Sequence, residues 1–548
     1  MNEGIQRVIQ RLPAGLTTAL FAALLLAPNL VLGTLPSHSS PHNHTWATQF
    51  ADQFRTGILY PRWMPESFDG LGGPTFYFYP PMVFWIDGLL DVVTAGILPV
   101  SQRLAIVALL LLWGSGWAMY AWLRAQPVNH RIALLGSLAY QIAPYHLVDH
   151  YIRGAIAEFA TYAVLPLVML GLRLTAAARP YGPMLLALAY AALLLSHLPT
   201  ALLISTIAIP VYVLFLAWPL DRATHPFLLR AAAAGLLGLG LAAIYLLPAV
   251  TLQDWISSEN LWTGHYVPGL SLLIAHDWTD PEYTMSIVLL ASLGCAAVAV
   301  GGLGRRAPAK DAVFWALLCL AGVILVAGFV PWFWTLPFLS KVQFPYRLLV
   351  VAEFAAITVL CVSPWRESRL ATRLCLIVAV GASVVAFGLL ASGVRLRVEA
   401  ALRSEIVRPH DAKEYLPAGY PQHATASYDD LSLDPVKDLP LIDCRPQARS
   451  CIVTSGHFGD LAIDIDSQNA TTVTLRRFFF PGWHLQPLGL LLTPSKPLHL
   501  VSFAAPPGRT TLWLRRRSLP IERWAWAIAG VSAALLLGWA AAIRKLRY

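Results

Sequence analysis

Clusters of arginine and lysine separate the long apolar runs of this chain, and their spacing limits how the chain can cross a membrane. Short loops rich in Arg and Lys stay in the cytoplasm because they resist translocation. The seven clusters are Arg7 and Arg11; Arg124 and Arg131; Arg173 and Arg179; Arg222 and Arg230; Arg305, Arg306 and Lys310; Arg366, Arg369 and Arg373; and Arg544, Lys545 and Arg547. Placing all seven in the cytoplasm predicts one topology, with both termini inside and about twelve spans.

The composition agrees with an integral membrane protein. Of 548 residues, 57% are hydrophobic and only 13% are charged, whereas about a quarter of a soluble domain is charged. The net charge of +9 is accounted for by topology, so no nucleic-acid partner is predicted. The first apolar run, 16–35, is long enough to span and lacks a small-residue cleavage site, so we expect an uncleaved first helix.

About twenty apolar residues cross a bilayer. The predicted spans are 14–35, 101–123, 132–147, 157–174, 183–197, 199–219, 230–252, 284–304, 311–333, 346–364, 370–393 and 521–543. Pro144 and Pro199, beside the two shortest runs, are expected to mark kinks or helix ends. The expected fold is an all-α polytopic membrane protein with a small β-rich domain on the outer side.

One apolar stretch, 76–98, does not fit as a span because crossing there would reverse every later loop. It begins with a dense aromatic group and carries Asp87 and Asp91 on one helical face. Aromatic rings favour the headgroup boundary, where an amphipathic helix can lie in the membrane plane. We therefore predict a juxtamembrane helix within a long first external loop, 36–100.

The largest external segment, 394–520, is polar and punctuated by Pro, Gly and Asp. Short runs at 451–454, 471–477, 498–503 and 510–514 have β-type composition. About 125 residues suffice for a domain with its own core. We expect a transmembrane domain (1–393), a β-rich periplasmic domain (394–520) and a C-terminal anchor (521–548). Cys444 and Cys451 in this exported segment favour a disulfide; two free thiols are the alternative.

Candidate site residues gather on the outer face. Asp149 and Arg153 are one helical turn apart and could pair. Glu158 would point away from them on a continuous helix, so Gly154 must break the helix if all three converge. Ionisable groups at membrane depth are costly and favour a functional interpretation; an ion pair that merely ends a helix is the alternative.

Other polar residues extend this candidate site. The first external loop contributes Asp52, Tyr60 and Arg62. Arg347 and Glu353 open a later span and, six residues apart, do not face each other on one helix. Each needs a partner elsewhere or a wet cavity, and packing against other helices is the alternative interpretation.

Histidines and tryptophans give weaker signals. His38, His42 and His44 are close enough to bind Zn or Cu, but no carboxylate or thiolate supports such a site and a solvated loop explains them as well. His197 is expected to be a helix-end histidine bonded to backbone. The aromatic loop 253–283 is either an interfacial belt or a sugar-stacking surface. No Walker loop, dinucleotide fingerprint, nucleophile elbow or HExxH motif has a supporting context, which argues against an ATP-driven pump.

Several sequence blocks resemble a bacterial family of polytopic proteins, the 6-pyruvoyl-tetrahydropterin-synthase-related membrane proteins. The blocks are GILYPRWMPESFDGLGGPTFYFYPP, APYHLVDHYIRGAIAEFATYAVLPLVML, LLLSHLPTAL, QFPYRLL and, late in the chain, FFFPGWHL. They cover residues 35–360, with an echo at 478–485. The zinc-binding histidine set of the soluble pterin enzyme has no counterpart here.

The architecture also resembles GT-C glycosyltransferases, which take sugars from polyprenyl-phosphate carriers. That resemblance implies an acidic residue early in the first external loop, but this chain has Asn43 there, and an amide cannot act as a base. Asp52, Asp149 and Glu158 are the alternative catalytic carboxylates. Arg62 and Arg153 would hold phosphate, and Tyr60, Arg347 and Glu353 would contribute to substrate binding.

The resemblance implies transfer of a sugar, in a bacterial inner membrane, from a polyprenyl phosphate to an envelope glycan or lipid acceptor. No cofactor is predicted, and a divalent metal ion is left open. A lipid-linked glycan transporter or flippase is one alternative; it would require charges in mid-span on several helices and related halves. A non-catalytic envelope assembly protein on a GT-C scaffold is the other, and Asn43 favours it.

Overall fold

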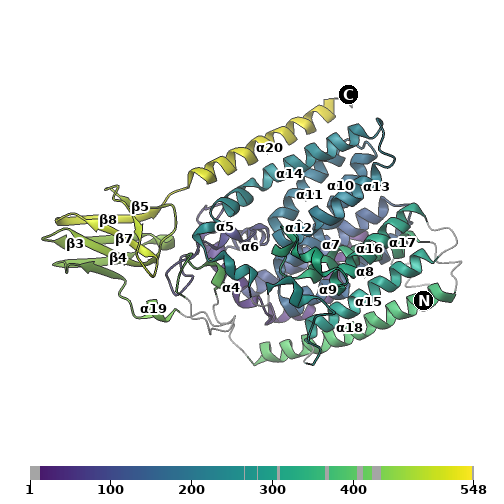
Figure 1. The fold of residues 1–548 in the computed structure, drawn as a ribbon, viewed down its shortest axis with the longest axis horizontal. Coiled ribbons are helices and arrows are strands. Elements are labelled where there is room, and N and C mark those ends of the chain that lie inside the picture. The colour runs from purple at the N-terminus through teal and green to yellow at the C-terminus, as the bar shows by residue number, and fades with distance from the viewer. Residues whose placement is uncertain are drawn as a thin grey trace.

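Helices make up most of the molecule, and two small sheets form a separate body at one end (Figure 1). The computed structural model describes residues 13–263, 266–279, 282–304, 309–363, 370–403, 411–421 and 433–545. Several members of the basic clusters lie outside the described residues: Arg7, Arg11, Arg305, Arg306, Arg366, Arg369 and Arg547.

The helices follow the apolar runs of the sequence. They are α2 (Ala14–Leu25), α3 (Ala27–Leu32), α4 (Ser40–Arg55), α5 (Thr75–Phe78), α6 (Met82–Val93), α7 (Val100–Arg124), α8 (His130–Gln141), α9 (Pro144–Val148), α10 (Ile156–Ala176), α11 (Gly182–Ser196), α12 (Leu198–Leu203), α13 (Ile209–Leu216), α14 (His225–Thr251), α15 (Tyr283–Leu303), α16 (Lys310–Ala327), α17 (Leu349–Val362), α18 (Leu370–Leu402), α19 (Asp434–Lys437) and α20 (Pro520–Lys545). Within the described residues, nine helical segments are long and apolar enough to cross a membrane, and two shorter apolar helices accompany them. The polytopic all-α fold is thereby confirmed.

Each predicted span corresponds to a helical segment, with differences where proline or a turn intervenes. The first span is divided at Leu26 into α2 and α3, and Pro28 stands in the first turn of α3. The predicted span 132–147 is divided between α8 and α9, with Pro144 at the start of α9. Helix α18 continues to Leu402, nine residues beyond the predicted end.

Helix α6 lies where the juxtamembrane helix was predicted, but its polar face points inward. Asp87 and Asp91 are fully buried and face Arg103 of α7. The outward residues Leu89, Val93 and, just beyond the helix, Ile97 are apolar and exposed. The aspartates are thus turned toward a cation of the bundle rather than toward water, and the outer surface of α6 is suited to contact lipid.

The first external loop contains a helix, α4, that the sequence did not predict. Pro41 stands in its first turn, where the missing N–H costs nothing. Trp46, Ala47 and Phe50 follow at helical spacing and are buried. His42 and His44 therefore lie on a helix, which corrects their interpretation as part of a solvated loop.

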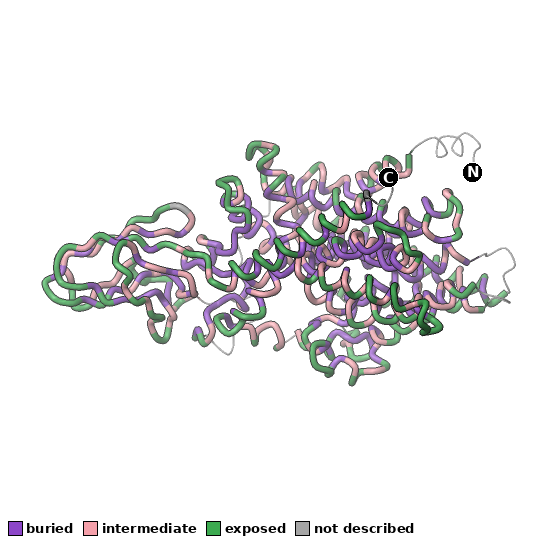
Figure 2. The backbone as a smooth tube through the Cα atoms, turned by 90° about the horizontal axis from the view of Figure 1, so that it is seen from above, coloured by how far each residue is buried: buried purple, intermediate pink, exposed green. Residues whose placement is uncertain are grey.

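Two four-stranded antiparallel sheets form the β-domain. The strands are β1 (Ile442–Arg445), β2 (Ser450–Ser455), β3 (Leu461–Ser467), β4 (Thr471–Phe478), β5 (Trp483–Gln486), β6 (Thr493–Pro494), β7 (Leu500–Ala505) and β8 (Gly508–Arg516). The sheet orders are β1-β4-β7-β6 and β2-β3-β8-β5. Buried and less buried residues alternate along β3 and β4, as expected for strands with one face on a core. Figure 2 shows buried stretches within the β-domain as well as within the helical bundle. Cys444 and Cys451 form a disulfide that links β1 to β2, the pairing that the sequence favoured.

The β-domain is fixed to the first external loop through backbone and arginine contacts. The Phe478 N–H donates to the Leu71 carbonyl at 2.9 Å, and Arg477 Nη1 donates to the Pro65 carbonyl at 2.9 Å. Arg476 pairs with Asp69. Gly72 (φ 82°) lies against the Trp63 ring so closely that a Cβ there would stand 2.4 Å from it. The two sequence blocks 57–81 and 478–485 are therefore in direct contact.

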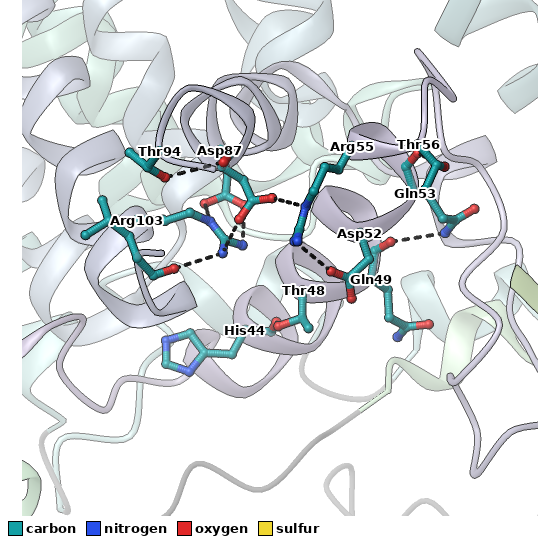
Figure 3. A network of polar contacts seen from close by, with 12 residues as sticks. His44, Thr48, Gln49, Asp52, Gln53, Arg55, Thr56, Asp87, Thr94 and Arg103 are labelled. Carbon is teal, nitrogen blue, oxygen red and sulfur yellow. Dashed lines mark hydrogen bonds and ion pairs between the residues drawn. The ribbon is translucent and has the colours of Figure 1, made fainter. Parts of the chain in front are cut away.

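The anchoring of α6 to α7 and α4 gives a stability prediction. Arg103 donates from Nε and Nη2 to Asp87 at 3.1 Å each and from Nη1 to Asp91 at 2.9 Å, and Arg55 Nε donates to Asp91 at 2.9 Å (Figure 3). Removing one partner of a buried ion pair leaves uncompensated charge. We expect Arg103→Ala to lower the free energy of unfolding by about 3–5 kcal/mol, measured by SDS titration of the purified protein.

The matched control for this substitution is Arg395→Ala. The Arg395 side chain is 78% exposed and pairs with Glu399 one turn away, so its loss is expected to change the free energy by less than about 0.5 kcal/mol. Equal effects of the two substitutions would contradict the structural role of Arg103.

Candidate functional site

The segment between α9 and α10 changes helical type and then breaks, and this irregularity creates the site. Asp149–Arg153 form a π-helical turn, η1, and Gly154 follows with left-handed backbone (φ 64°). Ala155 donates its N–H to the Asp149 carbonyl at 2.9 Å, closing the turn before α10 begins at Ile156. Glu158 is thereby brought back toward Arg153, as the predicted break at Gly154 required.

Glu158 is the centre of the resulting cluster and is fully buried. Its Oε2 accepts from Arg153 Nη1 at 2.8 Å and from Arg347 Nε at 3.0 Å. Its Oε1 accepts from the Tyr145 hydroxyl at 2.6 Å, and Arg153 Nη1 donates to that hydroxyl oxygen at 2.9 Å. Arg153 also pairs with Asp149. We call Tyr145, Asp149, Arg153, Glu158 and Arg347 the Glu158 cluster.

Arg347 enters the cluster from a separate segment that starts a later span. The 3₁₀ turn η9 (Pro345–Leu348) precedes α17. Arg347 Nη1 donates to the Val342 carbonyl at 2.6 Å and to Gln343 Oε1 at 2.9 Å. Its guanidinium carbon lies 4.9 Å from the centre of the Phe344 ring. Backbone, amide and ring contacts thus fix the orientation of this guanidinium before any ligand binds.

Glu353 contacts a member of the Glu158 cluster, Tyr145, but in the described part of the chain it has no bond to Glu158 or to the two arginines. Its Oε1 accepts from the Tyr145 backbone N–H at 2.8 Å, and its Oε2 accepts from the Tyr162 hydroxyl at 2.7 Å. Arg347 and Glu353 therefore each have a partner elsewhere, as their spacing predicted. Glu353 positions Tyr145, and Tyr145 in turn bonds to Glu158.

Unused hydrogen-bonding groups remain in the cluster. Arg153 makes its described hydrogen bonds through Nη1, and Arg347 makes them through Nε and Nη1. Nη2 of either arginine takes part in none of these hydrogen bonds between described residues, and Asp149 Oδ2 is buried without a partner among those residues. Two guanidinium groups and one carboxylate oxygen can therefore still bind polar groups.

The first external loop reaches the cluster through Asn43. Its Nδ2 donates to the Gly154 carbonyl at 2.7 Å, and the Ser39 N–H donates to the Arg153 carbonyl at 2.9 Å. The position at which the GT-C resemblance implied a catalytic carboxylate thus lies beside the cluster and holds an amide that is bonded to backbone.

Asp52 lies in a different network. Nine residues separate it from Asn43, about two and a half helical turns, so it occupies the opposite face of α4. Its carboxylate accepts from Arg55 Nη2 at 3.1 Å, and its side chain is 54% exposed (Figure 3). The structure therefore does not bring Asp52 into contact with the Glu158 cluster.

Arg62 and Tyr60 also lie in a network of their own. The Arg62 guanidinium carbon lies 3.8 Å from the centre of the Tyr60 ring, and Nη2 donates to the Ile244 carbonyl of α14 at 2.6 Å. Arg62 Nε is 3.9 Å from Glu522 Oε2 of α20, and Glu522 accepts from the Tyr77 hydroxyl. Arg516 of β8 donates to the same hydroxyl at 2.7 Å. This network joins the first loop, α20 and the β-domain.

The histidines do not form a metal site in the part of the chain that the structure describes. There, no three His, Cys, Asp or Glu side chains are placed to hold a metal ion. His197 ends α11, as expected for its position, but its Nδ1 bonds to Thr200 Oγ1 at 2.8 Å rather than to backbone.

Glu414 is a residue of interest that the sequence did not single out. It lies in the 3₁₀ turn η11 (Lys413–Tyr415), is buried, and its Oε2 has no partner within the described residues. Burial raises the pKa of the Tyr79 hydroxyl, and the charges of Arg347, Asp149, Glu158 and Glu414 act on that hydroxyl. Tyr79 is thus close enough to both Glu414 and the Glu158 cluster to interact electrostatically with each. A lone Glu in a polar segment gives no signal for this placement.

Glu414 gives a pH prediction. Burial raises its pKa from 4.5 to about 7, so the folded state binds a proton more tightly than the unfolded state does. The stability that this proton contributes is complete below about pH 4.5 and is lost as pH rises through about 7. Its size is of the order of 3 kcal/mol.

We expect Glu414→Gln to remove this part of the pH dependence, measured as unfolding free energy between pH 4.5 and 8. The exposed Glu399→Gln, whose side chain is 40% exposed, is the control and should leave the slope unchanged. An unchanged slope in Glu414→Gln would show that Glu414 does not titrate in this range.

Gly154 gives a prediction for the geometry of the site. Its left-handed backbone disfavours any residue with a Cβ, and a Cβ there would stand 2.0 Å from Ser37 Oγ. We expect Gly154→Ala to lower the unfolding free energy by about 1–3 kcal/mol and to displace Arg153 from Glu158. Gly235→Ala is the control, because that glycine has open space around it. Equal stability of the two variants would contradict the role of the break.

Comparison with known proteins gives a family and similar solved structures. The family model described as "6-pyruvoyl-tetrahydropterin synthase related domain; membrane protein" matches residues 76–393. No curated protein matches the chain. The solved structure of arabinofuranosyltransferase AftD from mycobacteria is similar over 69% of this chain and 27% of that chain, at 18% identity and a TM-score of 0.44. The structure of a mutant of that protein is similar over 67% of this chain and 28% of that chain, at 18% identity and a TM-score of 0.42. The chain therefore spans little more than a quarter of that protein's length.

Proposed function

This chain belongs to the 6-pyruvoyl-tetrahydropterin synthase related family of membrane proteins, as its sequence blocks predicted, and we propose that it is a membrane glycosyltransferase. It transfers a sugar from a polyprenyl phosphate to an envelope glycan or lipid acceptor on the extracytoplasmic face. The observation that carries the proposal is the pair of guanidinium groups, Arg153 and Arg347, held on one buried carboxylate at 2.8 and 3.0 Å.

The arginines are suited to a departing phosphate. Glu158 fixes both guanidinium groups in advance, and Nη2 of each takes part in none of their hydrogen bonds between described residues. Arginine binds phosphate oxygens through two N–H groups at once. When the bond between the anomeric carbon and the phosphate oxygen breaks, the phosphate keeps the electron pair. Fixed cations stabilise that developing charge without having to reorganise.

Asp149 is the carboxylate best placed to receive a proton. Glu158 is fully engaged by Arg153, Arg347 and Tyr145 and serves to hold them. Asp149 Oδ2 has no partner in the described residues. In the proposed step the acceptor hydroxyl bonds to the anomeric carbon and gives its proton to Asp149. The neutralised Asp149 then leaves Arg153 free to balance the negative charge that the departing phosphate gains.

The orientation proposed for the chain follows from its basic clusters. With Arg and Lys loops in the cytoplasm of a bacterial inner membrane, the β-domain and the Glu158 cluster face outward and both termini face inward. In support, α20 runs from the β-domain to the far end of the helical bundle, where the C-terminus lies (Figure 1). Cysteine labelling at Trp513, exposed on β8, from outside intact spheroplasts tests this orientation.

The decisive experiment measures transfer of radiolabelled sugar from polyprenyl phosphate in membranes that contain the full chain. We expect Arg153→Lys, Arg347→Lys and Asp149→Asn each to lower the rate by about a hundredfold or more. A lysine lacks the second nitrogen with which each guanidinium can bond both Glu158 and phosphate, and an amide at position 149 cannot accept a proton. Arg395→Lys is the matched control, since that side chain is 78% exposed. Transfer at the normal rate in all three stable variants would overturn the proposal.

A non-catalytic role in envelope assembly is the second candidate, and one observation favours it. Asn43, at the position implied for a catalytic carboxylate, donates its amide to the Gly154 carbonyl and cannot accept a proton. In that case the three cluster variants retain normal envelope glycans, whereas deletion of the β-domain strands alters them.

A further inference from the structure

Two loops line an open cavity that the proposed reaction does not use. Its volume is about 500 Å³, within the range of small-molecule sites. Its walls come from the loop after α14 and the loop after α16 and include Trp262, Leu272, Trp332, Trp334 and Lys341. Three indole rings and several aliphatic groups make this a mainly apolar cavity with one cation.

The protein surface around the cavity is apolar and exposed. Trp332 is 63% exposed, and its neighbours Phe329 and Phe338 are 70% and 72% exposed. Leu270 and Ile274 of the facing loop are exposed as well. Apolar side chains that gather outside the spanning helices indicate contact with a membrane or a partner. Indole rings at this density are typical of the headgroup boundary.

Phe338 adds an independent observation. Its backbone is left-handed (φ 69°), a conformation that costs energy for a non-glycine residue, yet its ring is exposed rather than packed in the core. The Lys341 N–H donates to the Phe338 carbonyl at 3.1 Å, so this turn is held by the backbone and presents an exposed aromatic ring that can enter lipid.

Lys341 gives the cavity a positive charge that is complementary to an anionic ligand. Its ammonium nitrogen lies 4.3 Å from the centre of the Trp262 ring, at the wall of the cavity. Gln343 connects this wall to the Glu158 cluster, since its Nε2 donates to the Leu261 carbonyl at 3.2 Å and its Oε1 accepts from Arg347. Because the proposed function assigns the donor phosphate to Arg153 and Arg347, Lys341 remains available for a second anion.

We propose that this cavity binds one anionic phospholipid of the surrounding membrane, with an acyl chain among the tryptophans and the headgroup phosphate on Lys341. The site goes beyond the proposed function and rests on it in two respects, the outward orientation and the assignment of the donor phosphate to Arg153 and Arg347. Through Gln343, the bound lipid would hold the loop that orients Arg347. A Lys near an anionic membrane surface contributes modest affinity, and burial of chain methylenes contributes the rest.

The test is native mass spectrometry of the purified full chain after exchange into phosphatidylglycerol or phosphatidylcholine. We expect retention of one phosphatidylglycerol in preference to phosphatidylcholine. Lys341→Glu should lower that retention at least about fivefold, and Lys437→Glu, in α19, should not. Trp332→Ala should also lower retention of the phospholipid, because it removes a ring that contacts the acyl chain. Trp526 is exposed on α20, so Trp526→Ala is the control and should leave retention unchanged.

Two outcomes would overturn the proposal. If wild type and Lys341→Glu retain phosphatidylglycerol equally, the headgroup phosphate does not bind Lys341. Displacement of the phospholipid by farnesyl phosphate at equal concentration would assign the cavity to the sugar donor instead. The measurement is separate from that of the reaction, because Arg153→Lys should retain the phospholipid while losing transfer; loss of transfer without loss of lipid therefore bears on the proposed function alone.

Discussion

A carboxylate with no access to water, Glu158, determines the arrangement of the surrounding backbone. A buried charge is tolerated only if cations and hydrogen-bond donors surround it. Its donors come from Tyr145, Arg153 and Arg347, which lie on three different segments. Bringing them together requires a π turn, a left-handed glycine and a 3₁₀ turn. Irregular backbone of this kind is stable at membrane depth only where the protein itself surrounds it.

Features that depend on local chemistry could be predicted from the sequence. Apolar runs predicted the spanning helices because length and hydropathy are properties of the segment itself. The break at Gly154 followed from helix geometry, since Glu158 cannot otherwise face Arg153. Four strands of the β-domain were predicted. Strand β3 was not predicted, although LAIDIDS alternates apolar and polar residues, because aspartate is depleted in strands and more typical of turns.

Features that depend on remote partners could not be predicted from one sequence. Arg62 meets Ile244 and Glu522, which lie far along the chain, and no spacing rule connects them. Asp52 was grouped with the site because it is near Asn43 in sequence, but α4 was not foreseen and places the two on opposite faces. Glu414 gave no signal because its burial depends on how the segment around η11 packs against two remote loops, through Ser257 on one side and through Trp46 and Phe78 on the other.

The ion pair between Arg62 and Glu522 links two segments that lie far apart along the chain. Arg62 lies in the segment before α5, and Glu522 lies in the first turn of α20. A chain that is inserted as it is synthesised therefore holds Arg62 without its carboxylate until α20 has been made. Completion of the region around Arg62 must wait for α20, so a truncation that removes α20 would disturb a region made hundreds of residues earlier.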